Sequence, residues 1–503
     1  MFNGSETLIV SAIVLVALGI LAWGYNRAQP YGQLGRLAWL QSVILMAPWL
    51  LFFGCFALGI YLNLAGIILL LLLSTGLYIY LGRRLRAAGQ QELLRDRAAQ
   101  RLAMSQAENS KPSPDETPAA DRNSEDTVEV PPIPEADLQV IRSIFGVDTF
   151  FATETISYQE GAIFKGNLRA EPEAAYEKLS EKLSEVVGDR YRLFLVENPD
   201  SKPVAIVLPS SNDPKPATLA QKNLTAVLFI ATLATSLEAA SNLLGFDWFS
   251  QLSRISEALP LALGLWLVII AHEAGHWVLA RRHHVRLMIP FFLPSWQIGS
   301  FGAITRFASQ IPNRTALLDI ALAGPAAGGI VSLLMLTVGL LLSQGDNIFT
   351  LPTQFFQGSV LVGTLAKVVL QSSLEDPIIS VHPLVVLGWL GLTISALNLL
   401  PAGQLDGGRI VQAIYGRKTA RRTTIGTLIV LGIVAIFNPA NPIPLYWGIL
   451  VLFLQRDLER PSLNELTEPD DARATLGLLA LFLMLATLIP LSPSLAGQLG
   501  IGN

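Results

Sequence analysis

Two histidines and a glutamate lie within five residues of an otherwise apolar segment, LVIIAHEAGHWVLA at residues 267–280. Side chains four positions apart lie on one face of a helix, so His272 and His276 would present both imidazoles together, with Glu273 beside them. This H-E-x-x-H spacing is typical of a zinc site in which the glutamate acts as a general base. Ionisable groups at membrane depth cost roughly 3 kcal/mol each, which argues for a functional role. The alternative is that the three groups hydrogen-bond to one another and join helices.

Catalytic zinc has three protein ligands and an open fourth position, so the pair needs a further ligand. The candidate is Asp406 in NLLPAGQLDGGR, residues 398–409, an acidic residue at the end of a later apolar segment. Pro401 interrupts helical hydrogen bonding, and Gly407 and Gly408 let the backbone turn back toward the pair. Asp406 could instead cap a helix, and the sequence pattern leaves both roles open.

The other three histidines are weaker candidates for a metal site. His283 and His284 lie in the basic loop RRHHVR, where contact with solvent or lipid headgroups is expected. His382 precedes the apolar segment 383–400 and is predicted on the opposite side of the membrane.

The composition is that of a membrane protein. Of 503 residues, 51% are hydrophobic and 15% are charged. The net charge is −4, and the basic residues form short clusters beside apolar segments, so no nucleic-acid partner is expected. The first apolar segment, 8–23, has no basic residue before it and is predicted to be a retained span.

Apolar segments long enough to cross a bilayer need about 20 helical residues. Seven segments meet this criterion clearly: 8–23, 37–62, 64–81, 259–280, 320–342, 383–400 and 474–489. Three weaker ones are 224–237, which is short before Glu238, and the pair 423–437 and 444–454, which NPANPIP separates and which could form a shallow hairpin.

Basic loop residues favour the inner side of a membrane, and alternating spans place every basic cluster on that side. These clusters contain Arg27, Arg36, Arg83, Arg84, Arg86, Arg281, Arg282, Arg286, Arg417, Lys418, Arg421 and Arg422. The H-E-x-x-H sequence is then expected near the inner end of its span.

The only long hydrophilic section follows the third span. Residues 87–136 are rich in Pro, Ser, Glu and Asp, a composition that cannot bury enough apolar surface to fold, and they are predicted to be a disordered linker. Residues 137–215 are predicted to form a small soluble α+β domain. EPEAAYEKLSEKLSEVV has helical spacing, and YRLFLV and PVAIVL flank the turn sequence ENPDSK like two strands of a hairpin.

These motifs together resemble the site-2 protease family of intramembrane zinc proteases. The family combines HExxH in one span with N-x-x-P-x-x-x-L-D-G in a later one, and the second motif is present as Asn398, Pro401, Leu405, Asp406 and Gly407. The resemblance implies one zinc ion per chain, bound by His272, His276 and Asp406. It also implies Glu273 as general base and acid, and Asn398 as a donor to the oxyanion.

Three further features bear on this resemblance. GSFGAITRF, residues 299–307, corresponds to a membrane-associated β-hairpin in the family, whose edge could hold an extended substrate; a connecting loop is the alternative. Gly324 and Gly328 form a small-xxx-small face whose expected role is helix packing. FKGNLR, residues 164–169, resembles the plastid and cyanobacterial branch, the relatives of the ethylene-dependent gravitropism-deficient yellow-green proteins. Residues 343–382 are too few for a PDZ-like domain.

The predicted fold is therefore a mostly α polytopic membrane protein with about 8–10 transmembrane helices, a β-hairpin and a soluble α+β domain. Its expected regions are 1–86, three N-terminal spans; 87–136, linker; 137–215, soluble domain; 216–416, metalloprotease core; and 417–503, C-terminal helices.

The expected function is zinc-dependent hydrolysis of peptide bonds in or near transmembrane segments of membrane proteins. A metal-binding transporter, a non-proteolytic scaffold and a membrane protease for soluble chains are the alternatives. The expected partners are transmembrane substrates and the lipid bilayer, in a bacterial inner membrane or a thylakoid or plastid membrane. The sequence assigns no substrate and no oligomeric state.

Overall fold

The computed structural model describes residues 19, 21–57, scattered positions between 70 and 85, and 133–501 except 159, 199, 201, 218, 296, 344–348, 440 and 456. It contains two compact units, Met1–Asp126 and Thr127–Asn503. The first includes a 3-10 turn, η1 (Gln29–Tyr31), and α2 (Gly32–Ala57). Most of the first and third predicted spans and the predicted linker up to residue 132 lie outside the described residues.

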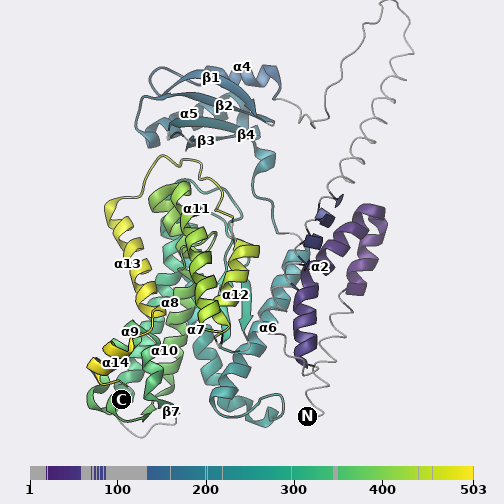
Figure 1. Ribbon diagram of the computed structural model, residues 1–503. Helices are drawn as coiled ribbons and strands as arrows, with labels where there is room; N and C mark the ends of the chain where they lie inside the picture. The colour runs from purple at the N-terminus through teal and green to yellow at the C-terminus, as the bar shows by residue number, and fades with distance from the viewer. Residues whose placement is uncertain are drawn as a thin grey trace, which may run out of the picture. The chain divides into compact units, whose positions relative to one another are not determined.

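The second unit begins with a small α+β domain. It contains α4 (Glu135–Ser143), β1 (Phe150–Tyr158), β2 (Gly161–Leu168), α5 (Pro172–Val187), β3 (Tyr191–Glu197) and β4 (Pro203–Pro209), with short 3-10 turns η2 (Gly188–Arg190) and η3 (Ser210–Asn212). The strands form one antiparallel sheet in the order β1-β2-β4-β3 (Figure 1). The residues of α5 that are buried recur every fourth position, which puts one apolar stripe against the sheet.

The predicted α+β elements of this region are present, including the helix at 172–187 and the hairpin of β3 and β4. The hairpin of β1 and β2 was not predicted. Its signal was present in the β-branched and aromatic residues of FFATETISY, which favour a strand.

The rest of the second unit is a bundle of apolar helices. Among the residues that the structure describes, five helices are long and apolar enough to cross a membrane: Gln221–Leu243, Leu252–Arg282, Arg314–Leu342, Asp406–Phe437 and Asp471–Leu488. They correspond to α6 (Leu219–Leu243), α7 (Ile255–Arg282, which follows a 3-10 turn), α8 (Arg314–Leu342), α11 (Asp406–Phe437) and α13 (Asp471–Leu488). Shorter apolar helices include α9 (Val360–Leu370), α10 (Pro383–Asn398) and α12 (Ile443–Leu450), which runs into a π-helical turn (Val451–Gln455). The last described helix is α14 (Pro493–Leu499). The prediction of a mostly α polytopic membrane protein is confirmed.

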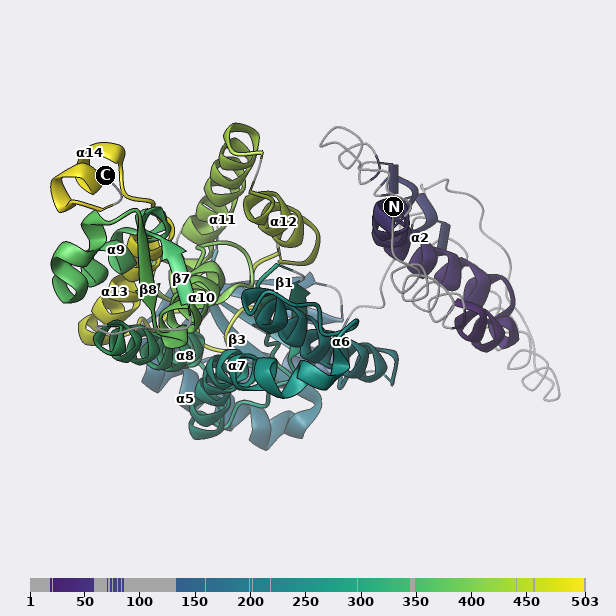
Figure 2. The ribbon, with the colours of Figure 1, turned by 90° about the horizontal axis from the view of Figure 1, so that it is seen from below.

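Helices α7, α8 and α10 pack against one another in this bundle (Figure 2). Glycines allow the close approach. A Cβ at Gly275 of α7 would lie 2.3 Å from the carbonyl oxygen of Ala323 in α8, and one at Gly388 of α10 would lie 2.3 Å from the backbone nitrogen of Leu336 in α8. A larger residue at either position would force the helices apart.

The predicted β-hairpin is present between α7 and α8. Strands β5 (Phe291–Ser295) and β6 (Gly299–Ile304) pair antiparallel, and all six residues of β6 are buried. The Thr235 hydroxyl of α6 donates to the Gly299 carbonyl oxygen at 2.6 Å, which fixes the turn of the hairpin to that helix.

The segment between α8 and α10 forms secondary structure that was not predicted. It contains β7 (Phe349–Pro352) and β8 (Ile378–Val381), which pair antiparallel, and α9 lies between them. His382 caps α10, where its Nδ1 accepts from the Leu384 N–H at 3.3 Å. Its side chain therefore serves as the N-terminal cap of α10.

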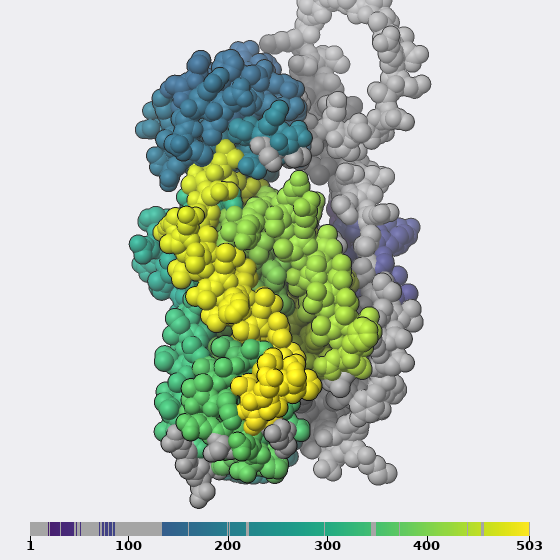
Figure 3. Space-filling model, turned by 60° about the vertical axis from the view of Figure 1, so that its left-hand side comes forward, coloured from purple at the N-terminus to yellow at the C-terminus, as the bar shows by residue number. Residues whose placement is uncertain are grey.

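A C-terminal segment, residues 459–465, joins the soluble domain to the bundle. The Leu195 N–H of the edge strand β3 donates to the Leu463 carbonyl oxygen at 2.8 Å, and the Glu465 N–H donates back to the Leu195 carbonyl oxygen at 2.8 Å. On its other side, Leu463 N–H donates to the Ile311 carbonyl oxygen, just before α8, at 2.9 Å. Figure 3 shows this yellow chain reaching the blue domain.

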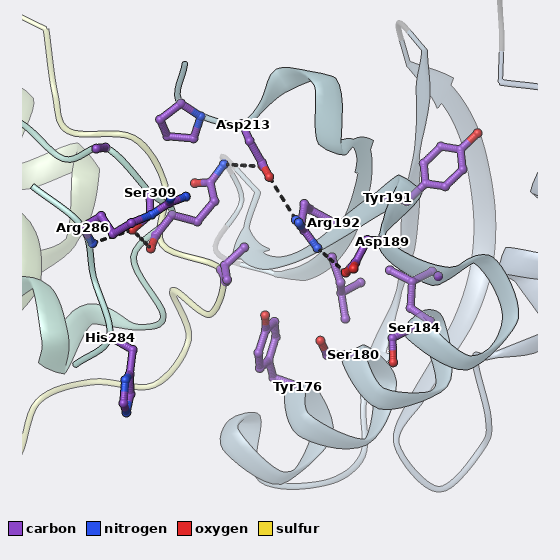
Figure 4. A pocket seen from close by; sticks show the side chains of 17 residues that line it. Tyr176, Ser180, Ser184, Asp189, Tyr191, Arg192, Asp213, His284, Arg286 and Ser309 are labelled. Carbon is purple, nitrogen blue, oxygen red and sulfur yellow. Dashed lines mark hydrogen bonds and ion pairs between the residues drawn. The ribbon is translucent and has the colours of Figure 1, made fainter. Parts of the chain in front are cut away.

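Beside this segment lies a cavity of about 340 Å³ between the soluble domain and the loops that flank the hairpin (Figure 4). Asp213 accepts from Arg192 Nε at 3.1 Å and from Gln310 Nε2 at 3.1 Å, so it ties the domain to the bundle. None of the residues predicted to bind metal lines the cavity. It belongs to the junction and is separate from the predicted metal centre.

Candidate metal centre

His272 and His276 lie on the inward face of α7, where they are 5% and 2% exposed. Their Nε2 atoms are 3.1 Å apart. The other ring nitrogen of His276, Nδ1, is 2.7 Å from the carbonyl oxygen of Ile320 in α8. Donation by Nδ1 would leave Nε2 with a free lone pair, which is the tautomer that binds a metal.

Asp406 meets this histidine pair from the start of α11. Its Oδ2 lies 3.2 Å from His272 Nε2 and 3.3 Å from His276 Nε2. A tight turn places it there: a Cβ at Gly407 would lie 1.8 Å from the Leu399 carbonyl oxygen, so only glycine fits. Asp406 is the first residue of α11, and the preceding residue has no side-chain cap. Of the two roles left open by the sequence, the geometry favours contact with the imidazoles.

The three atoms fit a zinc ion. A tetrahedral site with metal–ligand bonds near 2.0–2.1 Å separates its ligand atoms by about 3.3 Å. The separations here are 3.1, 3.2 and 3.3 Å. Two imidazole nitrogens and a carboxylate oxygen that converge at these distances could hold one divalent ion and leave a fourth position open.

Glu273 lies beside the pair and has one free oxygen. Its Oε2 accepts from the Thr305 hydroxyl at 2.6 Å, and its Oε1 is buried with no hydrogen-bond partner among the described residues. Candidate ligand atoms of His272, Glu273 and His276 all lie within 4.8 Å of one another. An unpartnered buried carboxylate oxygen at this distance could exchange a proton with a reacting group.

Asn398 lies at the end of α10 and is 3% exposed. Its Nδ2 donates to the Ile394 carbonyl oxygen at 3.0 Å and to the Phe301 carbonyl oxygen at 3.4 Å. In this conformation the side-chain amide links α10 to strand β6 of the hairpin.

The two histidines of the basic loop lie apart from this centre. His283 Nε2 is 2.9 Å from Asp319 Oδ2, and the other oxygen of that carboxylate accepts from Arg473 Nε at 3.0 Å. His284 has a positive φ of 55° and an exposed side chain. Neither joins the group that could hold a metal.

Three residues near the centre were missed by sequence reasoning: Thr305, Arg409 and Glu459. Arg409 is 2% exposed and lies 3.5 Å from Asp406, measured between Nη1 and Oδ1. Arg409 lies two positions after the L-D-G motif and could have been found by its position. Glu459 had no signal, because it is 50 positions from Arg409 in a polar loop.

A second arginine, Arg306, lies close to Arg409. Its guanidinium stacks on the Phe291 ring, with Cζ 5.1 Å from the ring centroid. Burial lowers the pKa of Arg306, and the nearby charge of Arg409 lowers this pKa further.

The expectation that Gly324 serves helix packing alone is too narrow. A Cβ at this position would lie 2.2 Å from His276 Nε2, and one at Gly328 would lie 3.1 Å from the His272 Cβ. The glycine face of α8 therefore provides the space that the imidazoles occupy.

Replacing Gly324 with alanine should lower zinc affinity by about 10- to 100-fold, because the new methyl group would displace the His276 ring. Competition with a chromogenic chelator on the purified protein would measure this. Gly329→Ala is the matched control, since no atom lies within 4 Å of a Cβ there. Equal zinc affinity in Gly324→Ala and Gly329→Ala would contradict this account of the glycine.

Comparison with known proteins agrees with this geometry. Residues 260–437 match the model of peptidase family M50, and residues 139–215 match the EGY3 middle domain. The chain is 40% identical over 368 residues to "Probable zinc metalloprotease EGY2, chloroplastic" of Arabidopsis thaliana, which covers 71% of this chain and 65% of that protein. It is 36% identical over 412 residues to "Probable zinc metalloprotease EGY1, chloroplastic" of Arabidopsis thaliana, covering 73% of each. No solved structure matches the chain.

A histidine pair, a glutamate and a facing carboxylate lie together among helices long and apolar enough to cross a membrane, an arrangement typical of the class of membrane-embedded zinc metalloproteases. The chain belongs to peptidase family M50, the site-2 protease family, and within it to the EGY zinc metalloproteases. The predicted resemblance is thereby confirmed. The chain spans slightly less than two thirds of the length of the EGY2 relative.

Proposed function

We propose that this protein is a zinc-dependent endopeptidase that hydrolyses peptide bonds in or beside the transmembrane segments of other membrane proteins. The observation that supports it is the convergence of His272 Nε2, His276 Nε2 and Asp406 Oδ2 at 3.1–3.3 Å beside the free oxygen of Glu273, within apolar helices. When bound, zinc would polarise the scissile carbonyl and lower the pKa of water.

Each residue of the centre has a proposed role. His272, His276 and Asp406 would hold the ion, and burial of these side chains would strengthen the attraction between the ion and the Asp406 carboxylate. Glu273 would accept a proton from the attacking water at Oε1 and deliver it to the leaving amine. The Thr305 hydroxyl donates to Oε2, so it would hold the carboxylate in place while Oε1 accepts and delivers the proton.

Asn398 is proposed as the donor to the oxyanion. Its longer bond, 3.4 Å to the Phe301 carbonyl oxygen, is the one that a substrate would replace. An extended substrate pairing with the hairpin of β5 and β6 would bring its carbonyl groups to this place, because strand addition exposes the peptide bonds that a helix shields.

A metal transporter is less well supported. Transport of a metal ion requires several metal-binding groups along a path through the membrane. In the part of the chain that the structure describes, only one cluster of three such residues could hold a metal ion: His272, Glu273 and His276. A scaffold without activity would need no stoichiometric zinc, so metal analysis separates it from a protease.

Chelation provides the test of the proposed function. The full chain would be reconstituted into proteoliposomes with a single-span reporter whose transmembrane helix contains a Gly-Pro pair. We expect cleavage to stop with 1,10-phenanthroline and to return when zinc is restored at about one ion per chain. Gel analysis and mass spectrometry would locate the cut. Cleavage that is indifferent to the chelator, or a purified chain without zinc, would contradict the proposal.

For the location we propose a plastid or thylakoid membrane, because the relatives are named chloroplastic. A bacterial inner membrane is the alternative. Fractionation of the source cells followed by immunoblotting would decide between them.

A further inference from the structure

Arg409 is buried next to the metal centre and is bonded on several sides. Its Nη2 donates to the Thr305 carbonyl oxygen at 2.8 Å, and its Nε and Nη2 lie 3.0 and 2.9 Å from Glu459 Oε2. Its Cζ lies 4.8 Å from the centroid of the Phe307 ring. A guanidinium this deeply buried is held in one place, because each lost acceptor would leave an unsatisfied charge.

Two of these contacts reach the residues of the proposed reaction. Arg409 Nη1 lies 3.5 Å from Asp406 Oδ1, the oxygen that does not face the imidazoles, so the cation orients the carboxylate with Oδ2 toward them. Arg409 also binds the backbone of Thr305, whose hydroxyl donates to Glu273. One guanidinium therefore fixes the rotamer of Asp406 and, through Thr305, the place of Glu273.

Glu459 balances the charge of this arginine. It is 7% exposed and lies in the C-terminal segment 459–465, beyond the residues that match the peptidase family. Arg409 lies 2.9–3.0 Å from Glu459 Oε2 but 3.5 Å from Asp406 Oδ1, so Glu459 balances most of its charge and leaves the charge of Asp406 for a divalent ion. Without Glu459, the charge of Arg409 would be balanced by Asp406 and would oppose the ion.

We propose that Arg409 and Glu459 form a positioning pair, in which Glu459 neutralises and holds Arg409 so that Arg409 can orient Asp406 and Thr305. This inference rests on the proposed function. It makes a segment outside the matched peptidase domain part of the metal centre.

The test is zinc affinity of the purified full chain, measured by chelator competition, together with the visible spectrum of the cobalt-substituted protein. Glu459→Gln keeps the shape of the side chain and removes its charge. We expect zinc affinity to fall about 10- to 100-fold and the cobalt spectrum to shift, because the carboxylate ligand is drawn toward Arg409. Arg409→Lys keeps the positive charge but loses the planar guanidinium with its several N–H donors. It should lower zinc affinity about 10-fold.

The chain offers a matched control in the same segment. Glu465 pairs with Arg417 of α11 at 3.7 Å and has a similarly buried side chain. Arg417 also donates to the backbone carbonyl oxygen of Glu459, so this control disturbs the same segment while it leaves the Glu459 carboxylate and its bond to Arg409 in place. Glu465→Gln should leave zinc affinity within about twofold and the cobalt spectrum unchanged. Thermal unfolding of the metal-free proteins would show whether each variant is folded.

Wild-type zinc affinity and spectrum in Glu459→Gln would overturn the proposal, as would equal losses in Glu459→Gln and Glu465→Gln, which would indicate a general structural role of the segment. If Glu459→Gln does not fold, wild-type affinity in Arg409→Lys would overturn it instead. These readouts do not depend on cleavage. Failure of the proposed function would appear separately, as a wild-type chain that binds zinc and cuts no reporter.

Discussion

Replacing Glu273 with glutamine should lower kcat/KM for a membrane reporter by about 10²- to 10⁴-fold while zinc stays bound. Glutamine keeps the shape of the side chain and can still accept from the Thr305 hydroxyl, but it cannot take a proton from water. The loss should fall on kcat, since proton transfer belongs to the transition state and substrate binding does not require it. Cleavage of a single-span reporter in proteoliposomes and metal analysis of the same preparation would measure both quantities.

Glu257→Gln is the control for this substitution. Glu257 lies in the first turn of the same helix and pairs with Arg254 at 2.8 Å, where both side chains are at least 40% exposed. Its replacement should leave cleavage and zinc content unchanged, because an exposed pair of this kind contributes little to stability. Persistent cleavage by Glu273→Gln would show that another group is the base. Loss of zinc from this variant would show that Glu273 is a ligand.

Replacing Asp406 with asparagine should lower zinc affinity by more than about 100-fold, the upper end of the effect of residues that only contact ligands. The amide is neutral and nearly isosteric, so the variant tests the charge at Oδ2, which lies 3.2 and 3.3 Å from the two imidazole nitrogens. Activity should be lost with the metal and should return in part at high zinc concentration. Chelator competition measures the affinity, and a zinc titration of reporter cleavage measures the recovery.

Asp471→Asn provides the matched control for Asp406→Asn. Asp471 is the first residue of α13 and Asp406 is the first residue of α11, but Asp471 is exposed. The control should bind zinc as the unaltered protein does. Unchanged zinc affinity in Asp406→Asn would contradict the assignment of Asp406 as a zinc ligand and would leave the histidine pair without a third protein ligand.

These two predictions separate the roles of the two carboxylates at the centre. Glu273→Gln should lose turnover and keep the ion, whereas Asp406→Asn should lose the ion first. The structural basis is the different surroundings of one oxygen of each carboxylate: Asp406 Oδ2 contacts both imidazoles, whereas Glu273 Oε1 has no partner among the described residues.

Much of this protein could be predicted from its sequence, because local chemistry dictates it. The four-residue spacing of His272 and His276 places them on one helix face in any helical setting, and an apolar segment of that length has few alternatives to a span. The stripe of α5 and the turn between β3 and β4 are also set by neighbours along the chain. The turn at L-D-G could also be predicted from the sequence, and the structure requires glycine at position 407 because the Leu399 carbonyl oxygen approaches it closely.

Only the tertiary structure decided which distant groups complete the centre. Glu459 reaches Arg409 because the C-terminal segment folds back between the soluble domain and the bundle, and nothing in the local sequence of that loop marks the contact. Gly324 makes room for His276 because of where α8 crosses α7, and Asn398 bonds the hairpin because β6 lies against α10. The physical reason is the same in each case: periodicity and turn chemistry act over a few residues, whereas these contacts depend on how whole helices pack.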